Sequence, residues 1–148
     1  MPATTTTFLS NATINITQGA TTYDLSDQAN QCTITVGVDP LEVTAFGDTG
    51  HIFRNGLQTV DVSITFFLSY GGTGATSEVE TALAAMVGQG TTTLTISPSG
   101  TTEGPSNPEY VISNAMLSSF TPINSTVGEI ATVTAQWTGG TWVRDITP

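Results

Sequence analysis

Hydrophobic and polar residues alternate along much of the chain with a period of two, the pattern of a β-strand that buries one face. The strictest alternation spans residues 59–68, whose apolar side chains share one side of the strand: Val60, Val62, Ile64, Phe66 and Leu68. A second clear pattern covers residues 31–38, and after Pro40 residues 41–46 form either a hairpin strand or a kinked continuation. Weaker alternation predicts strands at 13–17, 91–97, 110–120, 129–137 and 141–146.

One segment has the spacing of a helix instead. Its apolar side chains recur at i, i+4, i+7 and i+8: Val79, Leu83, Met86 and Val87. Ser77 and Glu80 have the spacing of a capping box, and Gly88 favours the left-handed conformation that ends a helix. Together these signals predict one short helix over residues 78–87.

About seven to eight strands with one short flanking helix predict a mainly β fold, either a β-sandwich or a small barrel. The 148 residues are enough for a single hydrophobic core. Residues 1–12 are rich in threonine and hold few large apolar side chains, so we expect an N-terminal arm there. Residues 13–148 are expected to form one domain.

The segment at residues 46–57 follows neither period. It contains three glycines, yet it also carries large apolar side chains: Phe46, Ile52, Phe53 and Leu57. A disordered segment would be poor in such residues, and a loop of this length inside a compact domain is usually functional. We therefore expect a long ordered loop whose apolar side chains are covered by another surface.

The chain carries a formal net charge of −10, because 12 acidic residues face two arginines and no lysine. Arg54 and Arg144 cannot neutralise the row of phosphates that a nucleic-acid site requires, so specific DNA or RNA binding is excluded. The same charge disfavours an anionic membrane surface, and no apolar run is long enough to span a bilayer. Without lysine the chain also lacks P-loop and Schiff-base chemistry.

Few residues offer catalytic or metal-binding chemistry. Asp48 and His51 are the pair from which a hydrolytic triad could be built, but no nucleophile motif accompanies them. Glu78 and Glu80 fit the first turn of the predicted helix better than a pair of catalytic acids. Cys32 lies on the apolar face of a strand, as expected of a small buried side chain. We predict no enzyme activity, no metal site and no cofactor.

Two tryptophans leave a different function open. Trp137 and Trp142 flank a turn that contains two glycines. Their rings form either a platform for sugars or part of a core or interface. A carbohydrate-binding β-sandwich module is therefore one alternative function.

Two stretches of the chain carry further short motifs. The first contains EVTAFGD at residues 42–48, followed by Asn-Gly-Leu at 55–57 and a VSITF strand at 62–66. The second contains Asn-Pro-Glu-Tyr at 107–110 and a VGE step at 127–129 ahead of the last long strand. With these motifs, most of the chain resembles the major tail tube protein of long, non-contractile-tailed bacteriophages.

The resemblance implies a structural virion protein of the phage tail, made in the cytoplasm of the host bacterium. Six copies would close into a ring whose inner sheets join into a continuous barrel, and rings would stack into a hollow tube. Genomic DNA would pass through the lumen without specific binding. The implied partners are further copies of the chain, a tape-measure protein, and tail-tip and tail-terminator proteins. A minor tail or decoration protein on a similar sandwich is a second alternative.

The resemblance also implies that the long loop contacts neighbouring subunits and rings. In this chain the inter-subunit loop comprises Phe46, Gly47, Asp48, Thr49, Gly50, His51, Ile52, Phe53, Arg54, Asn55, Gly56 and Leu57. Glu42 and Asp61 lie on the polar faces of their strands and are the candidate acids of the lumen. A negative lumen would repel the phosphates of the DNA and let it slide.

Overall fold

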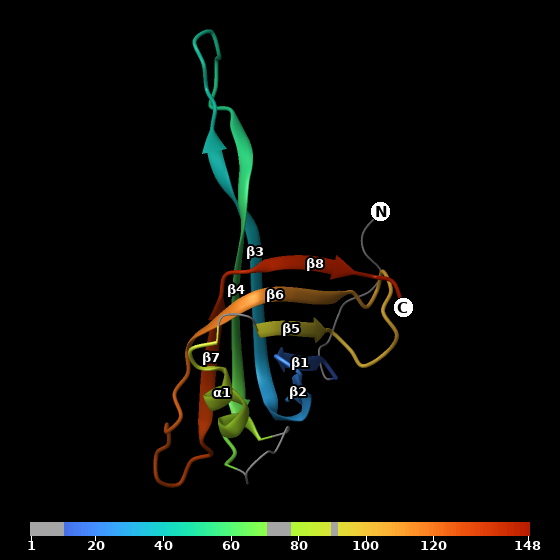
Figure 1. The fold of residues 1–148 in the computed structure, drawn as a ribbon, viewed down its shortest axis with the longest axis vertical. Helices are drawn as coiled ribbons and strands as arrows, with labels where there is room; N and C mark the ends of the chain where they lie inside the picture. Colours follow the sequence, from blue (N-terminus) through green and yellow to red (C-terminus); the bar gives the residue numbers. More distant parts are fainter. Residues whose placement is uncertain (1–10, 71–77, 90–91) are drawn as a thin grey trace.

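The computed structural model of the chain describes residues 11–70, 78–89 and 92–148. Within them the chain is mainly β with one α-helix, which confirms the predicted fold class (Figure 1). The elements are β1 (Thr13–Gln18), β2 (Thr21–Asp24), a 3₁₀ turn (Ser26–Gln28), β3 (Ala29–Glu42), β4 (Phe53–Phe67), α1 (Val79–Met86), β5 (Thr92–Ser97), β6 (Glu109–Ser119), β7 (Thr132–Thr138) and β8 (Thr141–Asp145). Most of the expected N-terminal arm, residues 1–10, lies outside the described residues.

The named strands pair antiparallel and form two sheets that share β6. We call β2-β1-β5-β6-β8 the crossing sheet and β3-β4-β7-β6 the hairpin sheet. β6 changes sheet between Ala115 and Met116, next to Asn114, whose φ is 59°. Its first part pairs with β5 and β8, and residues from Met116 onward pair with β7. In Figure 1 the crossing sheet runs across the direction of β3 and β4. Because the path of strands is not closed among the described residues, the fold they form is a sandwich and not a barrel.

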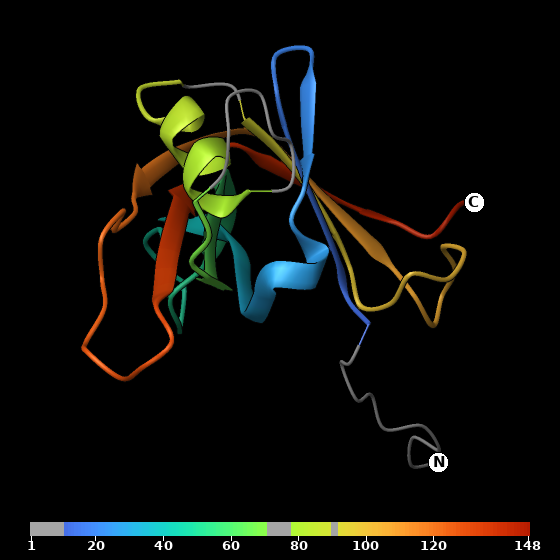
Figure 2. The same ribbon diagram turned by 90° about the horizontal axis from the view of Figure 1, so that it is seen from below.

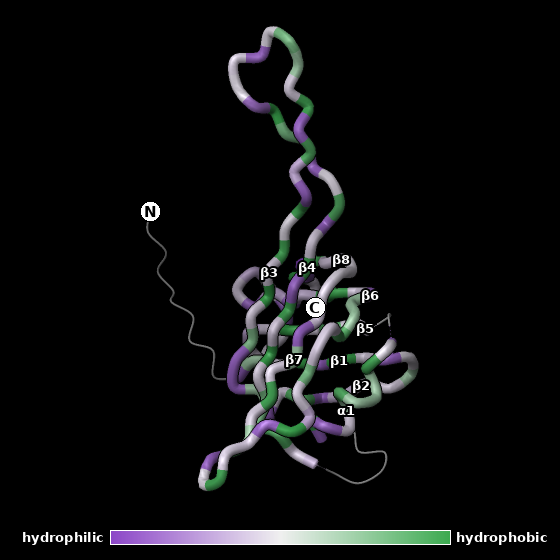
Figure 3. Tube along the Cα trace, turned by 90° about the vertical axis from the view of Figure 1, so that its left-hand side faces the viewer, coloured by the Kyte–Doolittle hydropathy of each residue, from purple (hydrophilic) through white to green (hydrophobic). Residues whose placement is uncertain are grey.

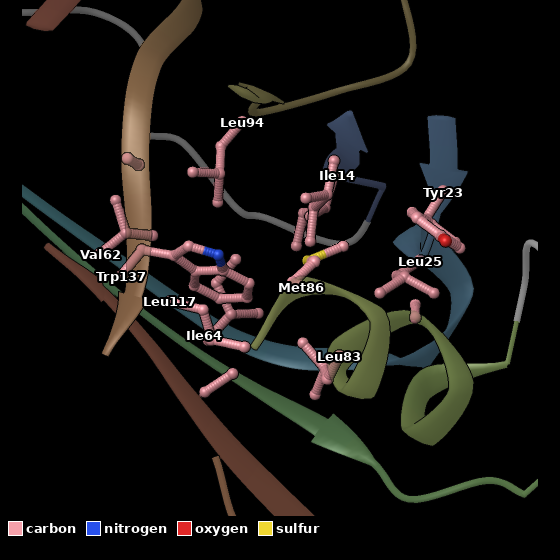
Figure 4. Packing of buried hydrophobic residues seen from close by; sticks show 14 of the residues in the cluster. Ile14, Tyr23, Leu25, Val62, Ile64, Leu83, Met86, Leu94, Leu117 and Trp137 are labelled. Carbon is pink, nitrogen blue, oxygen red and sulfur yellow. The ribbon is translucent and has the colours of Figure 1, made fainter. Parts of the chain in front are cut away.

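The hydrophobic core lies between the two sheets and beneath α1. The inward residues of β4 are buried as the alternation predicted: Val60, Val62, Ile64 and Phe66. The helix buries one face: Val79, Ala82, Leu83 and Met86. Figures 1 and 2 place α1 over the end of the core that lies away from the tip of the β3–β4 hairpin. Trp137 of β7 is 1% exposed and lies among side chains from both sheets (Figure 4).

The helix begins with a different partner from the predicted one. The backbone amides of Val79 and Glu80 donate to the side-chain and carbonyl oxygens of Ser69, each at 3.1 Å. Ser69 follows β4, so the end of this strand satisfies two amides that a helix leaves free at its start. The expected capping residue, Ser77, lies outside the described residues.

β3 and β4 form a long hairpin that projects from the sandwich (Figures 1 and 3). Their pairing continues to Glu42 and Phe53, with an irregularity at Pro40. The strand therefore continues past Pro40 with a kink, which is one of the two outcomes that the sequence pattern allowed. Gly56 lies opposite the kink, where a Cβ would be only 2.8 Å from the carbonyl oxygen of Asp39. A glycine is required at this position because the two backbones approach so closely.

The loop expected at residues 46–57 is shorter in the structure. The connection between the two strands spans residues 43–52, and residues 53–57 belong to β4. The expectation was wrong because both faces of the hairpin are open to solvent here. No buried side then enforces the alternation by which a strand is recognised in a sequence.

Cys32 of β3 is half-buried against the core, as its position on the apolar face predicted. Burial raises the pKa of its thiol from 9.0 to about 11. At mildly alkaline pH we expect iodoacetamide to alkylate the folded protein about a hundredfold more slowly than the unfolded chain, because the thiolate is the reactive form. Mass spectrometry with and without urea measures this ratio, and equal rates would contradict the burial.

Candidate functional site

The projecting part of the β3–β4 hairpin, residues 38–58, exposes many large apolar side chains. We name these residues the hairpin arm. Phe46 is fully exposed, Leu57 is 79% exposed and Phe53 is 55% exposed. The arm also exposes Val38, Leu41, Val43 and Ile52. Apolar side chains that gather on a projecting element mark a surface that binds another protein.

The tip of the hairpin arm is ordered by hydrogen bonds. The backbone amide of Val43 donates to the carbonyl oxygen of Ile52 at 2.8 Å. The amide of Ala45 donates to Oδ2 of Asp48 at 2.7 Å, and the amide of Ile52 donates to Oγ1 of Thr44 at 3.0 Å. The tip is therefore preformed, which lowers the entropy lost when a partner binds.

Glu42 and His51 meet across the base of the tip, with 2.5 Å between Oε1 of Glu42 and Nδ1 of His51. The hydroxyl of Thr44 donates to the same carboxylate oxygen at 2.9 Å. The hydrogen bond from His51, followed by that from Thr44, lowers the pKa of Glu42. The described contacts therefore pair His51 with Glu42, while Asp48 accepts from Ala45. Asp48 and His51 are not brought together as a hydrolytic pair.

The order of the tip should depend on pH. The pKa of Glu42 in the folded protein lies below its ordinary value of 4.5. The ionised carboxylate therefore stabilises the tip above that pH, and this stabilisation is lost as the pH falls through the lowered pKa. We expect the amide NMR signal of Ile52 to shift with this transition, and Glu42→Gln should remove the dependence. An Ile52 signal that titrates identically in both proteins would contradict the assignment to Glu42.

Arg54 lies in β4 within the hairpin arm and is opposite Leu41 in the strand pairing. Its side chain is exposed and forms no ion pair or side-chain hydrogen bond within the described residues. The adjacent Phe53 is exposed as well. The arm thus presents a free positive charge beside apolar side chains, an arrangement that suits a carboxylate on a partner.

The face of the hairpin sheet that points away from the core carries neutral polar side chains. Strand pairing places these residues side by side: Thr33, Thr35, Ser63, Thr65, Thr134, Gln136 and Thr138. We name this surface the hydroxyl face. Asp61 lies in the same array and accepts a hydrogen bond from the hydroxyl of Thr138 at 2.9 Å. The sequence alone could not place these residues together, because their adjacency depends on the strand order.

Both edges of the hairpin sheet lack a strand partner in the part of the chain that the structure describes. β3 pairs with β4 on one side, and the last part of β6, from Met116, pairs with β7 on one side. Unpaired edges bind other strands unless charged residues, above all lysine, block them. This chain contains no lysine, so both edges are suited to pair with another copy.

The tryptophans do not form the sugar platform that the sequence left open. Trp137 is 1% exposed and belongs to the core, so its ring cannot stack on a sugar. Trp142 is half-buried and packs beside Tyr110, with ring centroids 6.4 Å apart. Alternation around the Gly-Gly turn placed both residues in strands, but burial of Trp137 depends on packing between the two sheets.

A second exposed apolar segment was missed in the sequence. The connection between β6 and β7, residues 120–131, exposes Ile123, Val127 and Ile130. We name it the β6–β7 loop. Ile123 and Val127 give the same signal as residues 46–57, because they are large apolar side chains in a segment that follows neither period. Residues 129–131 were predicted as the start of a strand, but the strand begins only at Thr132.

No cluster of three His, Cys, Asp or Glu side chains among the described residues could hold a metal ion. No helix among these residues is both long and apolar enough to cross a membrane.

No family model and no curated protein matches the chain. Solved structures do match its fold. The SPP1 tail tube matches with a TM-score of 0.71 and 11% identity, over 95% of this chain and 79% of that chain. The sheath-tube complex of PVC, an extracellular contractile injection system, matches with a TM-score of 0.62 and 12% identity, over 96% of this chain and 93% of that chain. The tail of an empty GTA particle, with C6 symmetry, matches with a TM-score of 0.51 and 9% identity, over 90% of this chain and 94% of that chain.

Each likeness covers at least 90% of this chain. It therefore involves both sheets and is not limited to one motif. The chain has a fold that is shared by these tail and tube assemblies.

Proposed function

We propose that this protein is a structural virion protein, the repeating subunit of a phage tail tube. The observation that carries the proposal is the fold, which matches the SPP1 tail tube with a TM-score of 0.71. In this role, six copies close into a ring and the rings stack into a hollow tube. The C6 symmetry of the GTA tail supports the number six.

Ring closure uses the two free edges of the hairpin sheet. β3 of one copy pairs with the last part of β6 of the next copy, and the six hairpin sheets join into a continuous barrel. Such pairing satisfies the backbone groups that an isolated copy leaves open. A ring also removes the exposed edges without open-ended lateral growth.

The hydroxyl face lines the lumen in this arrangement. It offers DNA no cationic side chain, and Asp61 adds negative charge to the wall. Six copies at −10 each bring −60 to a ring, so the wall repels phosphates and DNA slides without bound counterions being released. Glu42 is a second candidate lumen acid, at the base of the arm's tip.

The hairpin arm contacts neighbouring subunits and rings through its exposed apolar side chains. Phe53→Ala and Arg54→Glu should each reduce the yield of tubes at least about tenfold, because a few central residues carry most of an interface's binding energy. Far-UV circular dichroism should stay unchanged, since both side chains are exposed on the arm. Pelleting followed by electron microscopy measures the yield.

Arg144→Glu is the matched control for this experiment. It makes the same change of charge on β8 of the sandwich body and should leave the yield of tubes nearly unchanged. Normal tubes from both arm variants would refute the role of the arm.

The partners in a virion would be further copies of the chain, a tape-measure protein inside the tube, and tail-tip and tail-terminator proteins at its ends. A minor tail or decoration protein would share the sandwich fold but would not stack into an open tube. Self-polymerisation therefore separates the two roles.

The test is to concentrate the purified protein and to examine it by sedimentation velocity and negative-stain electron microscopy. We expect large particles and hollow tubes or six-fold rings. A protein that stays monomeric at all concentrations, also when tail-tip and tape-measure proteins are added, would contradict the proposed function.

A further inference from the structure

The β6–β7 loop lies at the opposite end of the molecule from the tip of the hairpin arm, as two perpendicular views show (Figures 1 and 3). Its apolar side chains are among the most exposed of the described residues: Val127 is fully exposed, Ile123 is 80% exposed and Ile130 is 78% exposed. The two ends of the long axis therefore both present uncovered apolar side chains.

The β6–β7 loop is held against the sandwich body. The hydroxyl of Tyr70 donates to the carbonyl oxygen of Pro122 at 2.7 Å, and the side-chain amide of Asn124 donates to the carbonyl oxygen of Thr132 at 3.1 Å. A turn at the far end is closed by the amide of Glu129, which donates to the carbonyl oxygen of Thr126 at 3.0 Å. The apolar side chains thus belong to a fixed surface.

Charge distinguishes the two ends. Glu129 is the one charged residue of the β6–β7 loop, and its carboxylate has no partner within the described residues. It lies between the exposed Val127 and Ile130. On the hairpin arm, Arg54 is likewise unpaired and follows the exposed Phe53. The arm also carries the exposed carboxylate of Asp39. Each end therefore combines exposed apolar side chains with an unpaired charge beside them, and the charges of Arg54 and Glu129 are opposite in sign.

We propose that the β6–β7 loop is the docking site for the hairpin arm of a second copy of this chain in the adjacent ring, with Arg54 of one copy paired with Glu129 of the other. This inference rests on the proposed function. A contact between unlike surfaces at opposite ends of a molecule is heterologous and repeats without closing, which is the geometry of a stack. The chain has two arginines, and Arg54 is the one that lies on the arm, where it can pair with a carboxylate of another copy.

A charge-exchange series tests the pairing. Arg54→Glu and Glu129→Arg should each reduce the yield of tubes about tenfold and leave separate rings, since ring closure uses the edges of the hairpin sheet. The double variant that carries both changes should restore the yield to within about threefold of the original protein, because the pair is then reversed. Asp27→Arg, an exposed acid outside the β6–β7 loop, is the matched control and should assemble normally.

Each failure has its own meaning. If Glu129→Arg stacks like the original protein, or if the double variant stays as defective as the single ones, the docking site is elsewhere and this inference is overturned while the tube remains. If the original protein forms neither rings nor tubes under any condition of the test, the proposed function fails instead. Circular dichroism of every variant verifies that the sandwich is folded.

Discussion

Gly140→Ala is expected to lower the free energy of unfolding by roughly 3 kcal/mol or more, which is a large part of the stability of a domain of this size. Gly140 lies in the turn between β7 and β8 with φ at 90°. A Cβ at this position would overlap the carbonyl oxygen of Ser113 in β6 and lie 3.0 Å from the carbonyl carbon of Asn114. The new methyl group must therefore displace β6 where it passes from one sheet to the other.

Gly139→Ala is the matched control, because Gly139 has a similar φ of 82° but nothing within 4 Å of its missing Cβ. This variant should lose only about 1 kcal/mol of the free energy of unfolding, because an alanine at a positive φ is strained but meets no other atom. Urea unfolding followed by circular dichroism measures both variants. If both variants lose the same free energy of unfolding, the close approach of Gly140 to β6 does not contribute to the destabilisation.

Trp137→Ala is expected to lower the free energy of unfolding by about 3–5 kcal/mol, because it empties the largest buried site of the core. Trp142→Ala should lower the free energy of unfolding clearly less, since Trp142 is half-buried beside Tyr110. The same unfolding experiment compares the two tryptophans. A larger loss for Trp142 would contradict the assignment of Trp137 to the centre of the core.

The alternation at residues 59–68 predicted the inward side chains of β4, and the spacing of Leu83 and Met86 predicted the buried face of α1. Both patterns arise because one side of the element is buried, and one-sided burial spaces the apolar residues periodically along the sequence. The change of sheet within β6 cannot be read from the sequence, because the division of β6 between two sheets depends on which strands pair with it. The tertiary fold decides this pairing.

The hairpin arm could be predicted in part. Exposed apolar residues such as Phe46 and Phe53 stood out because they have no place in a disordered loop. Their arrangement on a hairpin and the contact between Glu42 and His51 could not be read from spacing, since they depend on the register of β3 with β4. The hydroxyl face required the strand order in the same way.

We propose that copies of this chain join at the edges of the hairpin sheet and enclose a lumen lined by the hydroxyl face. Electron cryo-microscopy of the assembled protein tests it directly, because end-on and side views give both the symmetry of the ring and the sheet that forms its wall. We predict six copies around an open channel, with Thr33, Asp61 and Gln136 on the channel side of a continuous barrel. A filament without a channel, or a ring in which the hydroxyl face points outward, would contradict the claim.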